Sequence, residues 1–175
     1  MTKDEMKKAV CRAIDEAAET IHKVVLDIES EPELGFKETK TAAKIETYMR
    51  SLGLDPKTGL ALTGVKSKVS GKENGPTIAV LAELDAVGTP DSPKADPLTG
   101  AAHTCGHFLQ MASMLAAATG IVKSGVMKEL SGNAVFFAVP AEEYVEIDYR
   151  KRLRKEGKIH FIGGKSQLVY EGHFD

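Results

Sequence analysis

The sequence predicts an α/β fold in which a mostly parallel central sheet lies between two layers of helices. Segments with helical periodicity alternate with short apolar runs typical of strands, and this order is characteristic of three-layer helix/sheet/helix domains. The chain has 175 residues, of which 42% are hydrophobic, and this is enough for one domain with a substantial core.

Five segments show the composition and spacing of helices: 4–30, 37–52, 106–123, 144–156 and 165–170. The first two repeat apolar residues every three or four positions, with Pro32 and Gly35 breaking the pattern between them and Gly53 ending the second. The third is almost uniformly apolar and should be deeply buried. Cys11 lies in the first helix, where we expect a small buried thiol.

Three segments are expected to form strands. Residues 60–70 alternate between apolar and polar types, which predicts a half-exposed strand. Residues 77–84 and 133–139 are short apolar runs typical of strands covered on both faces. Residues 87–100 are rich in Gly, Pro, Asp and Ser and should form a loop.

Charge and hydropathy exclude several kinds of partner. The net charge is -2, so nothing in the global charge favours nucleic acid or an anionic membrane. No apolar run reaches the roughly 20 residues that a membrane helix needs. The polar start is unlike a secretory signal, so we expect a cytoplasmic protein with reduced cysteines. The basic run at 149–155 is expected to be a solvated helix face.

The segment from His103 to His107 combines residue types that bind metal. A thiolate at Cys105 and an imidazole at His107 can converge on one borderline-soft ion such as zinc. Gly106 between them allows the backbone to bend so that both side chains point inward. A loop pair of histidines with an incidental buried cysteine is the alternative, because short motifs often match by chance.

Acidic residues follow both apolar strands. Glu142 and Glu143 come after the run 133–139, and one carboxylate could bind metal while the other transfers protons. The alternative is an acidic pair at the start of the next helix. Asp85 follows the run 77–84 and could orient a metal-binding histidine, or could simply cap a turn. Ligands gather at the carboxyl ends of strands in such sheets, which favours a site here.

Four motifs occur together in this chain: Pro32–Glu38, Ala82–Ala86, His103–His107 and Pro140–Glu143. In this order and spacing they resemble the amidohydrolase branch of the aminoacylase/carboxypeptidase-type zinc metallopeptidases, and the resemblance extends over nearly the whole chain. The likeness is greatest to aminobenzoyl-glutamate hydrolase-like and N-acyl-amino-acid amidohydrolase proteins. The resemblance implies a two-metal catalytic domain that hydrolyses an amide in an N-acyl amino acid, aminobenzoyl-glutamate or small peptide-like substrate.

The resemblance also implies a role for each matching residue. Cys105 corresponds to the ligand that bridges two metal ions, and His107 and Glu143 correspond to further ligands. Glu142 corresponds to the general base, and Asp85 to the acid that orients the site. The ions would be divalent; the thiolate favours zinc, with manganese or cobalt as alternatives.

Two departures from the family pattern affect what we expect. Phe108 stands where an acidic or amide residue usually follows the second histidine, and His103 occupies a position that is not usually a ligand. A further histidine ligand, a lid domain and a last histidine are also expected in the family. His173 does not correspond to that next ligand, so residues 1–175 are expected to be the N-terminal part of a catalytic domain, without the lid and the C-terminal half.

These departures leave two functions open. The first is metal-dependent amide hydrolysis, incomplete in this chain, with a small-molecule amide or peptide as substrate. The second is a truncated non-catalytic remnant that acts as a binding or interaction module. Catalysis by Cys105 as nucleophile with His107 as base is less attractive, because it gives Glu142 and Glu143 no role. Exposed apolar surface on a partial domain leads us to expect a homo-oligomer.

Overall fold

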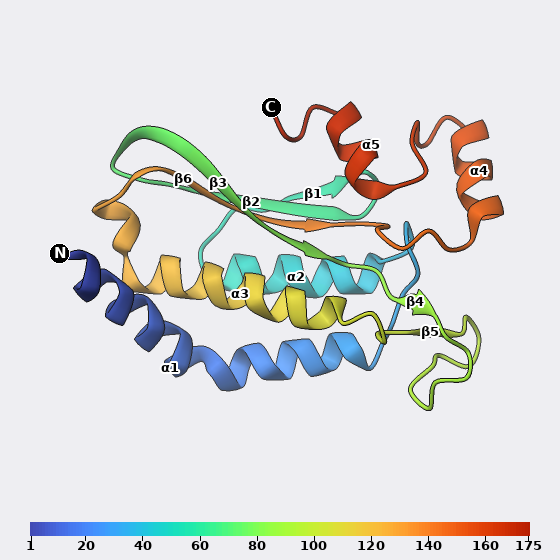
Figure 1. Ribbon diagram of the computed structural model, residues 1–175, viewed down its shortest axis with the longest axis horizontal. Helices are drawn as coiled ribbons and strands as arrows, with labels where there is room; N and C mark the ends of the chain where they lie inside the picture. The colour runs from blue at the N-terminus through green and yellow to red at the C-terminus, as the bar shows by residue number, and fades with distance from the viewer.

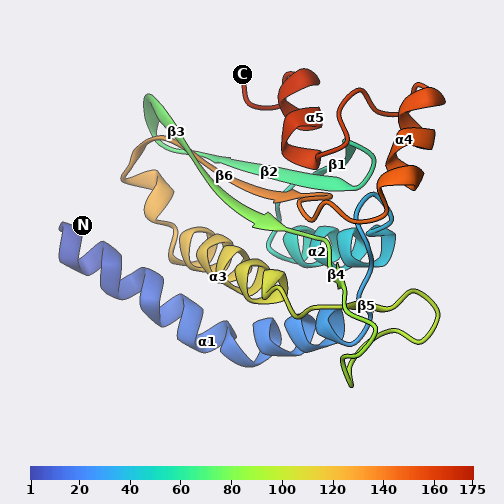
Figure 2. The same cartoon turned by 45° about the vertical axis from the view of Figure 1, so that its right-hand side comes forward.

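The fold has the three layers that the sequence predicts. A computed structural model describes residues 1–175. Three helices lie on one side of a four-stranded sheet, and two shorter helices lie on the other side (Figure 1). The view in Figure 2 shows the same separation from a second direction. The first set is α1 (Lys3–Glu29), α2 (Thr39–Ser51) and α3 (His107–Ser124), and the second is α4 (Ile147–Lys155) and α5 (Gly164–Tyr170).

The sheet is mixed, so the prediction of a mostly parallel sheet is wrong. Its order is β1-β2-β6-β3, with β1–β2 and β2–β6 antiparallel and only β3–β6 parallel. The strand expected over 60–70 is a hairpin whose turn includes Ala61 and Leu62, both at positive φ. A hairpin returns the chain antiparallel without a crossover helix, which explains the error. The strands are β1 (Lys57–Leu60), β2 (Gly64–Ser70), β3 (Glu73–Glu83) and β6 (Ser131–Val139).

Short elements complete the fold. The loop expected over 87–100 is enclosed by a two-stranded ladder of β4 (Val87–Gly88) and β5 (Ala101–Ala102). A single 3-10 turn, η1 (Val126–Lys128), follows α3. None of the helices combines the length and the apolar character needed to cross a membrane.

The larger core lies between the sheet and the three long helices, a region we call the helical face. Its sixteen buried residues include Ile21, Ile28, Ile45 and Met49, which follow the predicted three- and four-residue spacing. Phe136 joins them from the sheet and is fully buried. Seven of the eighteen residues of α3 are buried, whereas Leu109 is 58% exposed, so this helix is less deeply buried than its apolar composition predicts. Cys11 is exposed rather than buried, because it lies off the apolar stripe of α1.

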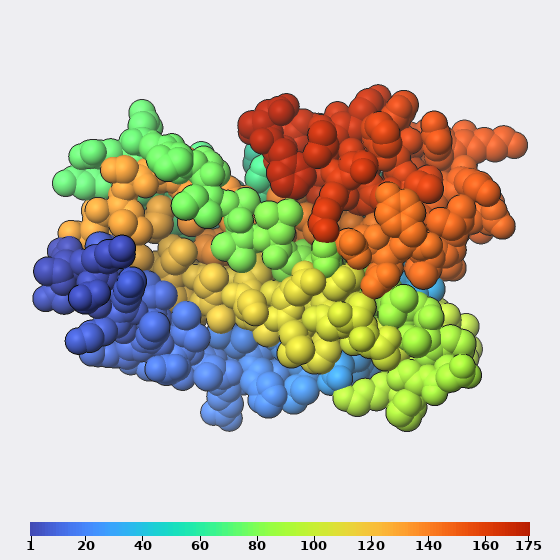
Figure 3. Space-filling model, viewed as in Figure 1, coloured from blue at the N-terminus to red at the C-terminus, as the bar shows by residue number.

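The strands differ in how far they are covered. β6 is central and its second half is fully buried, as its apolar run predicts. β3 is at the edge of the sheet, where Ile78 is 68% exposed and Leu81 is 38% exposed. Green atoms of β3 are visible at the surface between α3 and α5 in Figure 3. The expectation that both faces of residues 77–84 are covered is therefore wrong for the first part of that run.

Candidate metal centre

The one parallel strand pair brings the predicted acidic residues together. β3 pairs with β6 so that Glu83 lies opposite Val139, and both strands end at the same edge of the sheet. Asp85 follows β3, and Glu142 and Glu143 follow β6. We call this group, Glu83, Asp85, Glu142 and Glu143, the acidic edge. The sequence predicted that these acidic residues meet at the ends of two parallel strands. This is correct although the sheet is mixed, because only the β3–β6 pair needs to be parallel.

The start of α3 presents Cys105 and His107 to the acidic edge. Gly106 has a φ of 88°, a left-handed conformation that favours glycine, and His107 is the first residue of the helix. The Sγ atom of Cys105, a ring nitrogen of His107 and a carboxylate oxygen of Glu143 all lie within 4.8 Å of one another. Cys105 and His107 come from one segment and Glu143 from another, and the fold brings the three donors together.

The His107 ring is held from both sides. Its Nδ1 lies 2.8 Å from the main-chain carbonyl oxygen of Asp85, and its Nε2 lies 2.8 Å from Glu83 Oε2 and 3.7 Å from Glu142 Oε2. Burial disfavours a charged imidazole, but hydrogen bonds to Asp85 and Cys105 prevail and raise the pKa of His107 to about 11. Without metal the ring is thus a cation among anions, so the site favours a positive charge at this position.

Asp85 was expected to orient a metal-binding histidine, and it contacts His107 mainly through its main chain. The group that meets His107 Nδ1 at 2.8 Å is its main-chain carbonyl, whereas its carboxylate Oδ1 lies 3.4 Å from that nitrogen. Its other carboxylate oxygen, Oδ2, accepts the N–H of Glu143 at 2.8 Å. Asp85 is fully buried and its Oδ1 has no hydrogen-bond partner. One residue therefore contacts both the histidine and the loop that carries Glu143.

Glu143 is close to other carboxylates. Its pKa is raised, first by partial burial and then by the negative charges of Glu142, Asp85 and Glu83, while His107 opposes the shift. Like charges this close repel one another unless a cation lies between them. The donor set of thiol, imidazole and carboxylate suits zinc, and it fits the divalent ion that the sequence suggests.

His103 and Phe108 lie beside the centre. His103 is buried, neither ring nitrogen has a partner, and burial together with the nearby His107 lowers its pKa to about 4. Its ring centroid is 5.9 Å from that of Phe108, which also packs against the core of the helical face. Phe108 therefore contributes packing at the position where a polar group was expected.

The chain is similar to known hydrolases and peptidases. The YhaA protein of Bacillus subtilis is 34% identical over 142 residues, which cover 79% of this chain and 35% of YhaA. The N-acetylcysteine deacetylase of the same organism is 33% identical over 121 residues, covering 67% of this chain and 31% of the deacetylase. The crystal structure of Bacillus subtilis YxeP, a dinuclear metal-binding peptidase of the M20 family, superposes with a TM-score of 0.62 at 29% identity, covering 79% of this chain and 39% of YxeP.

The chain is homologous to M20-family amidohydrolases and peptidases. It spans about a third of the length of the curated relatives that it matches. No family model matches the sequence. The likeness to a dinuclear metal-binding structure supports a divalent metal as the cofactor.

Sequence reasoning gave no role to two groups of this M20-type centre. Glu83 lies 2.8 Å from His107 Nε2, and Lys165 of α5 forms an ion pair with it at its other oxygen. Lys165 also lies 4.0 Å from Glu142. Glu83 could have been found, because residues two apart on a strand point to the same side and Glu83 precedes Asp85 by two. No local pattern marks Lys165, which is 82 residues from Glu83.

Arg150 differs from what the sequence predicts. Arg150 belongs to the basic run that was expected to be a solvated helix face, yet it is fully buried. Its neighbours Lys151 and Arg152 are exposed, as expected. Arg150 points inward because α4 packs one side against the loop after β6.

The described residues provide two overlapping groups of possible ligands. One is Cys105, His107 and Glu143; the other is Glu83, His107 and Glu142. Both groups include His107, so one imidazole is common to the two sets of donors.

Proposed function

We propose that this chain binds one divalent metal through Cys105, His107 and Glu143, and that residues 1–175 form part of a catalytic domain for amide hydrolysis. The observation that carries the proposal is the convergence of these three donors within 4.8 Å, with the Glu142 carboxylate 3.7 Å from His107. Zinc is the favoured ion, with manganese and cobalt as alternatives. The intact family uses two ions, and the second would need ligands beyond the group described above.

The proposed substrate is an N-acyl amino acid, aminobenzoyl-glutamate or a small peptide. The N-acetylcysteine deacetylase among the relatives supports the first class. A hollow of about 180 Å³ beside Glu142, lined also by Tyr144 and Lys165, has room for a small acyl group. A homo-oligomer and a cytosolic location stay predictions.

The chemistry assigns separate tasks to the two glutamates. A bound divalent metal would lower the pKa of water toward ~7 and polarise the amide carbonyl. Glu143 would bind the ion. The carboxylate of Asp85 would keep Glu143 in place, because it accepts the hydrogen bond from the main-chain N–H of Glu143. Glu142 would accept a proton as water adds to the amide carbon, and would return it to the amine nitrogen as the carbon–nitrogen bond breaks. The products would be a carboxylic acid and an amine.

Calorimetric titration with zinc tests the metal proposal directly. We expect one ion per chain, and at least about 100-fold weaker binding in C105S and in E143Q, because each variant removes one of three protein ligands. C11S is the matched control, since Cys11 is an exposed thiol far from the centre in sequence. Wild-type affinity in C105S would overturn the assignment.

Hydrolysis separates an enzyme from a binding module. We expect the zinc-loaded catalytic domain of which residues 1–175 form part to release amine from an N-acetylated amino acid, and E142Q in that domain to keep zinc while losing this activity. Stoichiometric zinc with no hydrolysis of any substrate class named above would instead favour the alternative, a non-catalytic module.

A further inference from the structure

The loop that carries Glu142 and Glu143 is held by charged side chains from three other segments. The N–H of Ala141 donates to Glu38 Oε1 at 2.8 Å, and the N–H of Glu143 donates to Asp85 Oδ2 at 2.8 Å. The carbonyl oxygens of Ala141 and Glu143 both accept hydrogen bonds from Arg150. The residues on each side of Glu142 are therefore fixed at both their donor and their acceptor groups.

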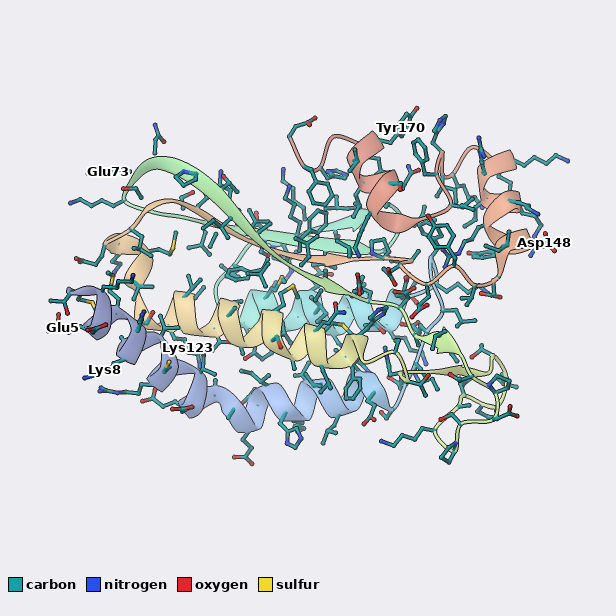
Figure 4. All side chains as sticks on the ribbon, viewed as in Figure 1. Glu5, Lys8, Glu73, Lys123, Asp148 and Tyr170 are labelled. Carbon is teal, nitrogen blue, oxygen red and sulfur yellow. The ribbon has the colours of Figure 1, made fainter.

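Arg150 is a buried cation whose donors contact main-chain carbonyls only. Its Nη1 donates to Ala141 at 3.3 Å and to Ile162 at 2.8 Å, and its Nη2 donates to Glu143. The guanidinium lies 5.3 Å from the ring centroid of Phe36. None of the ion pairs in the structure involves this residue. Figure 4 shows the contrast on the same helix, where the labelled Asp148 points outward.

Gly35 leaves the space that Arg150 occupies. A Cβ atom at this position would collide with Arg150 Nη2 and would lie 2.9 Å from the Cα atom of Ala141. Close approach of this kind is a recognised reason for glycine. The G35A substitution would therefore push against both the guanidinium and the main chain of Ala141, without removing the charge of Arg150.

Glu38 holds the same loop at the N–H of Ala141. It is fully buried, and its second oxygen accepts the hydroxyl hydrogen of Thr63 at 2.6 Å. Ala141, which it binds, has a φ of 52°, a conformation that costs energy for a residue with a side chain. The contacts of Glu38 and Arg150 compensate that cost and keep the turn in this shape.

Burial of a charge without an ion pair is a poor way to gain stability, because its desolvation penalty is several kcal/mol. Apolar side chains would fill the same space at less cost. The gain must come from what the donors of Arg150 bind: two of its three contacts hold carbonyls of the loop that carries the two glutamates, and the third holds the carbonyl of Ile162. Orientation of the loop is therefore the function of these buried groups.

We propose that Arg150 and Glu38 are positioning residues that orient Glu142 and Glu143 toward Cys105 and His107. The role of these residues in metal binding rests on the proposed function, but their restraint of the loop does not depend on it. Neither residue touches the proposed ion. Both act through the main chain of Ala141 and Glu143.

Hydrogen–deuterium exchange of the metal-free chain tests the restraint. We expect R150M, G35A and E38L to increase exchange in the peptide covering 140–146 by at least tenfold, with α1 and α3 unchanged. E38Q should behave as the wild type, because its amide oxygen still accepts from Ala141. R154M is the matched control, since Arg154 is an exposed residue of the same helix.

Cobalt binding tests the purpose of that restraint. We expect R150M and G35A to bind Co²⁺ about 10- to 100-fold more weakly, the range usual for loss of a group that orients ligands. The thiolate-to-cobalt absorption band should remain, because Cys105 is on a different segment, while the visible bands that report carboxylate ligation should change. R154M and E38Q should keep the wild-type spectrum.

The outcomes separate the two proposals. Folded R150M and G35A with wild-type exchange and cobalt affinity would overturn the positioning role, as would exchange that rises equally throughout the chain. If wild-type chain binds no cobalt, the proposed function fails, and the exchange of residues 140–146 still decides whether Arg150 and Glu38 restrain the loop.

Discussion

The helical face and the acidic edge are stabilised by different kinds of interaction. The core cluster of the helical face has sixteen buried residues and consists of hydrophobic side chains. The acidic edge and its supports contain fully buried charged groups, among them Glu38, Asp85 and Arg150. Packing of apolar side chains stabilises the first region, whereas the desolvation of buried charges destabilises the second. A change in packing should therefore affect the whole fold, and a change at the edge should affect pH dependence and metal binding.

The largest expected effect comes from the helical face. Phe136→Ala should lower the free energy of unfolding by about 3–5 kcal/mol, because Phe136 is fully buried and its loss leaves a cavity. Urea denaturation followed by circular dichroism measures the change. Phe161→Ala is the control, since Phe161 is 43% exposed and should cost much less. A loss below about 1 kcal/mol for Phe136→Ala would contradict the packing account.

The next effect comes from Glu38 and depends on pH. Burial raises the pKa of Glu38 from 4.5 to about 7 in the folded chain. A raised carboxyl pKa means that the unfolded state loses its proton first, so stability falls as pH rises from about 4.5 to about 7. Glu38→Gln has no such proton, and above pH 7 it should be more stable than the wild type by up to about 3 kcal/mol.

Urea denaturation at several pH values between 4.5 and 8 checks this prediction. The difference between Glu38→Gln and the wild type should shrink as the pH falls toward 4.5, where Glu38 is protonated in both states. A difference that stays constant across this range would show that Glu38 keeps an ordinary pKa in the folded chain.

A smaller effect is expected from a buried pair of hydroxyl groups inside the helical face. The hydroxyl of Tyr48 lies 2.9 Å from that of Thr119, which donates to the carbonyl of Leu115. Tyr48→Phe should cost about 1 kcal/mol, the usual value for a buried hydrogen bond between neutral groups. The cost should not change between pH 5 and 8, in contrast to Glu38→Gln. The double variant Y48F/T119V should cost less than the sum of the two single changes.

The smallest effect is expected on the outer surface of α2. Glu46 and Arg50 form an exposed pair at 2.9 Å, one helical turn apart. Glu46→Ala should change the free energy of unfolding by less than about 0.5 kcal/mol. The difference should decrease further in 1 M salt, because screening weakens exposed pairs. A salt-independent loss above about 1 kcal/mol would mean that surface charge matters more to this fold than packing suggests.

The two regions also differ in how well the sequence predicts them. Ile21, Ile28 and Ile45 repeat at helical spacing, so the helical face follows from local pattern alone. The ends of the apolar runs placed Asp85, Glu142 and Glu143 at one edge for the same reason. The hairpin at Ala61 and Leu62 was missed because its turn needs positive φ at residues that rarely adopt it.

Contacts between distant segments could not be read from the sequence. Glu38 and Ala141 are 103 residues apart, and no spacing rule joins them. Arg150 carries the same sequence signal as its exposed neighbours, and only the path of the loop after β6 turns it inward. Buried charges depend on tertiary contacts more than apolar residues do, which is why the sequence missed the contacts of Glu38 and Arg150 but placed Asp85, Glu142 and Glu143 at one edge of the sheet.

The exposed edge of β3 has a consequence for handling the protein. From Thr77 to Ala82 the strand has no charge, its backbone can accept another strand on one side, and Ile78 and Leu81 remain partly exposed. Such segments nucleate cross-β aggregates when chains meet at high concentration. Pro76 and the glutamates at Glu73 and Glu83 bound the segment and act as gatekeepers. The shelf life of a concentrated sample will be set by these six residues rather than by the melting of the core.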